Sequence, residues 1–407
     1  MFLIDFSQLI YLAIVIFIGG LILYVRRKAK AGRSLYKLLL ILTGIILASL
    51  TFNGSPVFSF DKLFLRNLSG LLLVVLMFEL SMRLSPDNIS FKKKNIMTFF
   101  LILLANILAI SILSLFLLKT DVITAMVFSI IISSVEYFLV DELKEEGDFA
   151  NPFLLLFAFS LMFFYNLEDT FAMNIGSFLQ YILIGLAMGI ALGIIVSKSV
   201  RGRKITWFHE IGLISIALVA YIFTNNIGGS GLFAVMVIGT MFGNSYVKKR
   251  SNMTTFSPFI FKNLEVLIFL LLGFSVAISI SKQLIVYGII LFLAYLITRF
   301  IILSIIDRKY SGENIILLTF APKGMVFVAT ILILSNYGGF SGDMINIMLI
   351  ILVLSLISTA VFEYFEKRKI EYLEKVYTVL RKIRYGRRTH VHSSNRKIDL
   401  FAIFKRH

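Results

Sequence analysis

The chain has 407 residues, of which 58% are hydrophobic and 15% are charged, and its formal net charge is +17. Apolar runs of about 18 to 25 residues recur along it, which excludes a soluble globular domain and indicates a polytopic helical membrane protein. The chain contains no cysteine, so disulfides and thiol-based metal or redox chemistry are excluded. It contains four histidines, which leave almost no material for a His-ligated metal centre.

The apolar runs predict an all-α fold with about 13 transmembrane helices, and we expect this transmembrane domain to cover residues 1–365. The first run lacks a basic region before it and a cleavage site after it, so we interpret it as a span and not as a signal peptide. The expected spans, in chain order, are 8–25, 36–52, 63–82, 95–118, 121–140, 151–167, 174–197, 206–224, 229–244, 259–280, 284–306, 313–334 and 344–365.

Basic residues are unevenly divided between the predicted loops. Nineteen Lys or Arg residues follow odd-numbered spans, whereas three follow even-numbered spans. Cytoplasmic loops carry such an excess, so we expect the N-terminus outside and the C-terminus inside the cell membrane. The same pattern accounts for the net charge without nucleic acid as a partner.

Residues 366–407 form a basic tail with 13 Lys or Arg residues and four Asp or Glu residues. Apolar residues recur at helical spacing between 366 and 384. We therefore predict an amphipathic helix on the cytoplasmic surface, attracted to anionic lipid. The last residues of the tail have a composition typical of disorder.

Five ionisable residues fall well inside the predicted spans, where an unpaired charge is costly. One interpretation is a network of salt bridges that holds the helices together. The other is a pathway for an ion or a proton, which intramembrane charges often mark. The five residues are Glu79, Glu136, Glu265, Arg299 and Lys323.

Glu136 is the first candidate for an ion or proton carrier. It follows Ser133 and Ser134 in the fifth span, and carboxylate and hydroxyl oxygens are the ligands that a hard cation prefers. A buried Glu can also hold a proton near neutral pH, which would let a proton compete with the cation. The alternative is a structural ion pair with Lys323 or Arg299.

Lys323 is the second candidate, and it lies in the twelfth span between Pro322 and Gly324. Proline removes a backbone donor and glycine weakens a helix, so we predict a helix break there. Transporters build binding sites near the middle of the membrane from broken helices. We expect the fifth and twelfth spans to be a pair of broken crossing helices in an inverted repeat.

Several stretches resemble the motifs of the monovalent cation:proton antiporters, the sodium/proton exchangers. Arg299 also falls where that family has an arginine in its eleventh helix. The resemblance implies an antiporter fold, a homodimer, and rocking of spans 3–5, 10–12 and the sixth against a scaffold. The stretches are Leu76–Glu79, Ile227–Val235 with Gly239, Gly243 and Asn244, Glu265 with Phe269 and Gly273, and Ala321–Gly324.

Two departures from the family pattern affect the predicted site. Where the family has a Thr-Asp-Pro step in its fifth helix, this chain has Val135-Glu136-Tyr137, which keeps an acid and lacks the proline. The family's sixth helix carries an aspartate that binds the ion and the proton, whereas the predicted sixth span, 151–167, contains no carboxylate. A two-carboxylate site is therefore not visible in the sequence.

We predict a secondary active transporter that exchanges Na⁺ or K⁺ for protons through Glu136, with Lys323 as its counter-charge. Two alternatives stay open. One is an anion or solute pathway, favoured by the lack of a carboxylate in the predicted sixth span, and the other is a non-transporting membrane sensor. An enzyme is not expected, because no catalytic triad, metal cluster or phosphate-binding loop is present. We expect no cofactor.

Overall fold

The computed structural model describes residues 6–29, 32–53, 55–82, 93–134, 171–200, 207–246, 257–275, 281–306, 319–337 and 340–385. The sixth expected span, Glu136 and the residues after 385 lie outside these ranges. The chain divides into two compact units, Met1–Ala360 and Val361–His407. Whether the functional boundary lies at residue 365, as the sequence predicts, stays a prediction.

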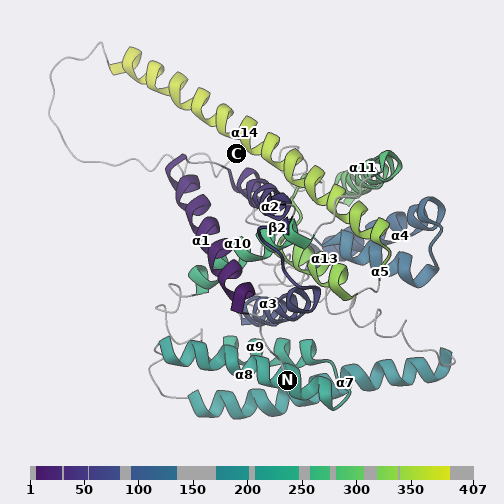
Figure 1. Ribbon diagram of the computed structural model, residues 1–407. Helices are drawn as coiled ribbons and strands as arrows, with labels where there is room; N and C mark the ends of the chain where they lie inside the picture. Colours follow the sequence, from purple (N-terminus) through teal and green to yellow (C-terminus); the bar gives the residue numbers. More distant parts are fainter. Residues whose placement is uncertain are drawn as a thin grey trace. The chain divides into compact units, whose positions relative to one another are not determined.

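The described residues are almost entirely helical (Figure 1). A two-residue antiparallel pair, β1 (Thr51–Phe52) with β2 (Ser55–Pro56), interrupts the helices. Each described helix overlaps one of the expected spans. The helices are α1 (Phe6–Ala29), α2 (Arg33–Ser49), α3 (Lys62–Met82), α4 (Lys93–Leu118), α5 (Val122–Ser133), α7 (Phe171–Val200), α8 (Trp207–Asn226), α9 (Gly231–Tyr246), α10 (Ser257–Ser275), α11 (Lys282–Ile306), α13 (Met325–Tyr337) and α14 (Gly342–Tyr385).

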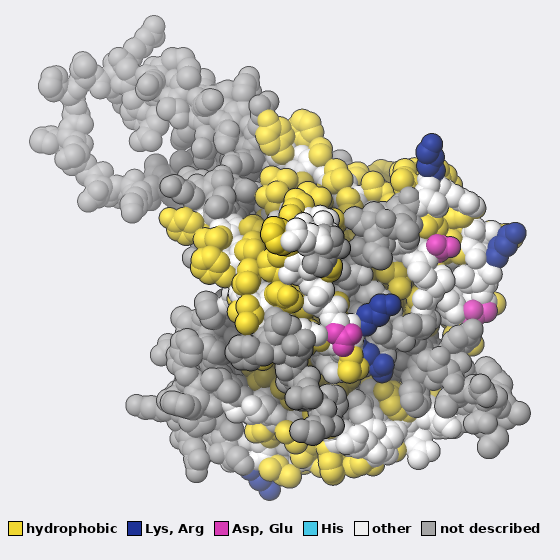
Figure 2. Space-filling model, viewed as in Figure 1, with side chains coloured by type: hydrophobic (Ala, Val, Ile, Leu, Met, Phe, Trp, Pro, Cys, Tyr) yellow, Lys and Arg dark blue, Asp and Glu magenta, His cyan; other side chains and the backbone are white. Residues whose placement is uncertain are grey.

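Among the described residues, five helices are long and apolar enough to cross a membrane by length and composition. Their lipid-facing character is visible in single side chains: Leu183 of α7 is 61% exposed, and Phe116 of α4 is 78% exposed. Figure 2 shows apolar side chains over much of the described surface of one face, with few charged ones among them. The protein is a multi-pass membrane protein, and the count of about 13 spans stays a prediction.

Glycines let α7, α9 and α3 pack backbone to backbone, and Figure 1 shows α7, α8 and α9 side by side. Gly189 of α7 is one of three glycines spaced four residues apart; a Cβ there would lie 2.9 Å from Ala234 O of α9. Gly239 of α9 faces α3, where a Cβ would lie 2.9 Å from Phe78 O. Lipid tails are as apolar as leucine, so close packing through small residues is what associates helices in a membrane.

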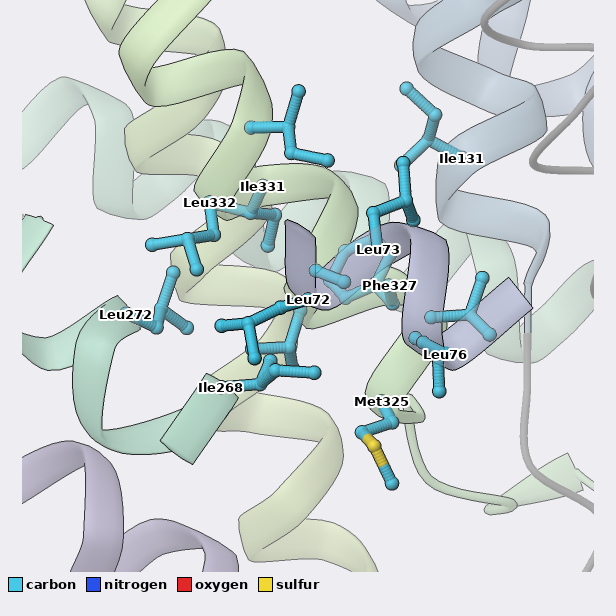
Figure 3. Close-up of a cluster of buried hydrophobic side chains, with 14 of the residues drawn as sticks. Leu72, Leu73, Leu76, Ile131, Ile268, Leu272, Met325, Phe327, Ile331 and Leu332 are labelled. Carbon is cyan, nitrogen blue, oxygen red and sulfur yellow. The ribbon is translucent and has the colours of Figure 1, made fainter. Parts of the chain in front are cut away.

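A cluster of buried aliphatic side chains joins α3, α10 and α13 (Figure 3). Leu72 and Leu76 of α3 meet Ile268 of α10 and Phe327 of α13 there, and all four are at most 4% exposed. Dense packing of this kind transmits displacement instead of absorbing it. The cluster therefore holds α13, and with it the segment that leads into α13, in a defined position.

Candidate ion-binding site

Helix α5 is a short helix with a defined beginning and end. Asp121 caps its N-terminus by accepting a hydrogen bond from Thr124 N at 2.9 Å. The helix ends at Ser133, and Ser134 is extended with φ −66° and ψ 137°. Its 12 residues rise about 18 Å, which is well short of the roughly 30 Å of a bilayer core. Ser134 N closes the helix by donating to Ile131 O at 3.2 Å. The carbonyl oxygens at a helix end can accept hydrogen bonds from groups outside the helix.

The segment 321–324, which precedes α13, is not helical. Two hydroxyls of α14 hold it: Ser355 Oγ accepts from Lys323 N at 3.0 Å, and Thr359 Oγ1 donates to Phe320 O at 2.7 Å. The first helical bond after the segment runs from Val328 N to Gly324 O at 3.2 Å. The predicted break at Pro322 and Gly324 stays a prediction for the span as a whole, because 307–318 lie outside the described residues.

The Lys323 ammonium lies against the end of α5 and is completely buried. It donates hydrogen bonds to Ile132 O and, at 3.2 Å, to Ser134 O. These carbonyls carry the negative end of the helix dipole, which stabilises a cation at that position. The charge of Lys323 is thus balanced by backbone oxygens, in addition to any group outside the described residues.

Aromatic rings complete the surroundings of Lys323. Its Nζ lies 3.7 Å from the centroid of the Tyr295 ring and 5.6 Å from that of the Phe327 ring, both within the range of a cation–π contact. Arg299, one turn beyond Tyr295 on α11, donates a hydrogen bond to the Tyr295 hydroxyl and is also completely buried. One tyrosine therefore contacts two buried cations.

Ser133 and Ser134 bring two hydroxyl groups to the last turn of α5, and both residues are buried. Ser133 Oγ donates to Ser129 O at 2.7 Å, and Ser134 Oγ donates to Ile131 O at 2.8 Å. A hydroxyl that donates keeps its oxygen lone pairs for a second partner. The end of α5 therefore offers carbonyl and hydroxyl oxygens, the donor set that Na⁺ and K⁺ prefer.

Comparison with known proteins assigns the family. The transmembrane profile of sodium/hydrogen exchangers matches residues 12–367, which is most of the chain. The chain belongs to the sodium/hydrogen exchanger family. The resemblance stated from the sequence motifs is confirmed.

Two solved structures share the fold of this exchanger. The sodium proton antiporter MjNhaP1 from Methanocaldococcus jannaschii at pH 8 has a TM-score of 0.68 and 15% sequence identity, over 87% of this chain and 98% of that chain. An electron-microscopy map of MjNhaP1 has a TM-score of 0.69 and 14% identity, over 89% of this chain and 96% of that chain. At such identities the likeness establishes the fold.

One sequence relative is the low-affinity Na⁺/H⁺ antiporter NhaS1 of Synechocystis sp.. It is 26% identical over 151 residues, which are 35% of this chain. The match covers 29% of NhaS1, so this exchanger spans less than a third of that relative's length.

The exchanger contains a second buried lysine that the sequence analysis did not single out. Lys37 of α2 is 2% exposed, and its Nζ lies 3.3 Å from Glu265 Oε1 of α10. The same Nζ lies 5.4 Å from the centroid of the Phe269 ring. Glu265 is therefore a partner of Lys37.

The structure describes Glu79, another predicted intramembrane charge of this exchanger, but not Glu136. Glu79 of α3 is 3% exposed, so its carboxylate lies inside the helix bundle, as expected for an intramembrane acid. Glu136 lies two residues beyond Ser134 and outside the described residues. Its role as ion or proton carrier, and its pairing with Lys323, stay predictions.

The residues missed by sequence reasoning have local sequence patterns that mark them weakly or not at all. Tyr295 is one apolar residue among many in α11, and Ser355 and Thr359 are ordinary polar residues of α14. Lys37 lies close to the start of its span, where a lysine normally reaches the membrane surface. A signal was present for Lys37 alone, because Leu38 to Leu42 begin an apolar run directly after it.

Proposed function

We propose that this exchanger is a secondary active transporter that moves a monovalent cation, Na⁺ or K⁺, in exchange for protons across the cell membrane. The observation that carries the proposal is the Lys323 ammonium, itself a monovalent cation, buried on the backbone oxygens Ile132 O and Ser134 O. A site that holds one buried cation on dehydrated oxygens can hold another of similar charge. Membership of the exchanger family supports the same activity.

In the proposed cycle, Lys323 and the transported cation compete for the end of α5. With the site empty of metal ion, the protonated Lys323 neutralises the helix dipole and the Glu136 carboxylate. When Na⁺ or K⁺ arrives, it takes the carbonyl oxygens together with Ser133, Ser134 and Glu136, and the ammonium is displaced. Protonation of Glu136 releases the cation and Lys323 returns to the carbonyl oxygens; the proton is carried across and lost from Glu136 on the other side, which restores the empty state. Cation and proton are thus carried in alternate halves of the cycle.

The broken helices give the proposed site two accessible sides. The non-helical segment 321–324 supports a broken twelfth span, and the end of α5 at Ser133 supports a broken fifth span. We propose that the bundle of spans 3–5, 10–12 and the sixth, which includes α3, α4, α5, α10, α11 and α13, rocks against the rest of the protein. Helices α3 and α10 contact α13 within this bundle, and they contact α9 and α2, respectively, outside it, so they lie at its boundary.

The wider assembly follows the sequence predictions. We propose a homodimer with the N-terminus outside and the C-terminus in the cytoplasm. The basic tail, 366–407, would then bind anionic lipid on the cytoplasmic surface. Crosslinking in native membranes and labelling of each terminus from either side test these features independently of transport.

Proton exchange in proteoliposomes tests the proposed activity. A preset proton gradient is followed while Na⁺ or K⁺ is added, with wild type beside Glu136→Gln and with Ser114→Ala of α4 as a control. We expect cation-dependent dissipation in wild type and in the control, and its loss in Glu136→Gln, because a neutral amide cannot carry the proton. Absence of a signal with either ion from pH 5 to 9, in folded wild-type protein, would contradict antiport.

One observation favours the second candidate function, an anion or solute pathway. Two buried cations, Lys323 and Arg299, meet at one tyrosine, and a cluster of positive groups attracts anions. Under this function, Glu136→Gln would keep or raise flux, and anion replacement would change it. The same proteoliposomes loaded with chloride or with gluconate separate the two candidates.

A further inference from the structure

Tyr295 occupies a central position among the charges of the candidate site. It lies on α11, is 1% exposed, and contacts two cations through different parts of its side chain. Its ring face lies 3.7 Å from Lys323 Nζ, whereas its hydroxyl accepts a hydrogen bond from Arg299. The Arg299 Cζ also lies 5.4 Å from the ring centroid.

The ring acts on one protonation state of Lys323. The face of an aromatic ring carries partial negative charge and attracts an ammonium, most strongly where water is excluded. At 3.7 Å the Lys323 Nζ is in direct contact with the Tyr295 ring, whereas the Phe327 ring at 5.6 Å is a weaker neighbour. A neutral amine gains little from this contact. The Tyr295 ring therefore favours the protonated lysine on the carbonyls of α5.

From α11, Tyr295 and Arg299 face the Lys323 ammonium. Of the helices packed against α13, α3 and α10 carry one buried or partly buried acid each, Glu79 and Glu265, respectively. Helix α5 faces it with the carbonyls Ile132 O and Ser134 O. The hydroxyls of Ser355 and Thr359 on α14 contact the backbone at Lys323 and at Phe320, respectively. Arg299 is thus the one like charge among these neighbours, and the Tyr295 hydroxyl receives its hydrogen bond.

We propose that Tyr295 is a positioning residue that holds the protonated Lys323 on the end of α5 and so sets the pH range in which a transported cation can displace it. The Tyr295 ring carries this effect, whereas its hydroxyl accepts the hydrogen bond from Arg299. The inference rests on the proposed antiport function, because it concerns competition at the same oxygens.

The direction of the effect follows from this arrangement. If the ring is removed, the protonated lysine loses a favourable contact, and the cation displaces it at a higher proton concentration. Exchange should therefore begin at lower pH, and the apparent KM for the cation at the acid end should fall. If the ring is kept and the hydroxyl is removed, the pH range should stay where it is.

Four variants test this inference in full-length protein: Tyr295→Leu, Tyr295→Met, Tyr295→Phe and Phe292→Leu. Phe292 is a matched control, because it lies on the same helix with its ring centroid 6.4 Å from that of Tyr295. Exchange is measured in proteoliposomes from pH 5 to 9 with Na⁺ and with K⁺. Thermal stabilisation by each ion in detergent gives a readout of cation binding that does not depend on transport.

We expect Tyr295→Leu and Tyr295→Met to lower the pH of half-maximal exchange by about one unit, with a roughly tenfold lower apparent KM near pH 6, as a cation–π contact of usual strength implies. Tyr295→Phe and Phe292→Leu should keep the wild-type pH profile. Tyr295→Phe should lower thermal stability, because it removes the acceptor of the Arg299 hydrogen bond. If Tyr295→Leu does not fold, Tyr295→Met carries the same expectation.

Two results would overturn the role of Tyr295: an unchanged pH profile in folded Tyr295→Leu or Tyr295→Met, or an equal shift in Tyr295→Phe. Both of these results can be read only if the wild-type protein exchanges a cation for protons. Failure of the proposed function is a different result, namely folded wild type without exchange and without stabilisation by either ion. The two failures are therefore distinguished by the wild-type measurement alone.

Discussion

Two lysines are buried in the part of the chain that the structure describes, Lys323 and Lys37, and they are neutralised in different ways. Lys37 faces the Glu265 carboxylate at 3.3 Å, and the Phe269 ring lies 5.4 Å away. Lys323 faces the carbonyl oxygens of α5, and the Tyr295 ring lies 3.7 Å away. A full opposite charge locks a lysine in place, whereas dipoles and a ring hold a cation that another cation can replace. We therefore expect Lys37 to stabilise the fold and Lys323 to take part in the proposed transport.

The surroundings of the two lysines reinforce this difference. Near Lys37, helices α2 and α10 pack through glycine: a Cβ on Gly273 would lie 2.7 Å from Gly44 Cα. Near Lys323, α5 ends at Ser133 and the segment 321–324 is not helical. A regular helix pair leaves no backbone oxygen for a ligand, whereas interrupted helices expose several.

The largest expected effect comes from Lys323→Ala. This change removes an ammonium that makes two charge-assisted hydrogen bonds, each worth about 1.5–3 kcal/mol. We expect the rate of cation-dependent proton exchange to fall by at least about a hundredfold at every pH between 5 and 9, whereas Lys323→Arg should retain part of it. Exchange at the wild-type rate in Lys323→Ala would show that Lys323, like Lys37, is not needed for transport.

Lys37→Met should instead change stability. Leaving Glu265 without its partner costs about 3 kcal/mol, the lower end of the usual range because Glu265 is 16% exposed. The double variant Lys37→Met with Glu265→Gln should recover most of that loss, and its pH profile of exchange should match wild type. Thermal unfolding in detergent and exchange in proteoliposomes measure the two quantities. A shifted pH profile in the folded double variant would assign this pair to transport as well.

Ser134→Ala should have the smallest effect and sharpen the comparison. It removes one hydroxyl group at the end of α5, and a ligand of this kind contributes about 1 kcal/mol. We expect the apparent KM for the transported cation to rise about fivefold with little change in the maximal rate. Ser335→Ala of α13, where the hydroxyl donates to Leu332 O at 2.9 Å, serves as the control. Equal KM values for the two variants would exclude Ser134 as a ligand.

Much of the fold was predictable, because an apolar run long enough to span a bilayer is a local property of the chain. The helices α3, α7 and α11 overlap the expected spans 63–82, 174–197 and 284–306. The family followed from motifs such as Ala321–Gly324 together with Arg299. The count of spans and the pair of broken crossing helices were not established, since they depend on residues outside the described ranges.

The candidate site was predictable in part. Ser133, Ser134 and Lys323 were named from the sequence, and the structure brings them together at the end of α5. Tyr295 could not be named, because an aromatic residue in an apolar helix shows its role only when a cation is placed over its ring. The salt-bridge network considered from the sequence contained five charged residues and did not include Lys37, which pairs with Glu265.

The sequence by itself determined the membrane class, the approximate helices, the exchanger family and the presence of rare charges at membrane depth. Each of these depends on residue type and spacing along one segment. The tertiary structure alone decided which acceptor each lysine meets, because Lys323 and Ile132 are 191 residues apart in the chain. Such a contact depends on how α5, α11, α13 and α14 pack. A buried charge is costly wherever it lies, but its partner determines whether it stabilises the fold or exchanges with an ion.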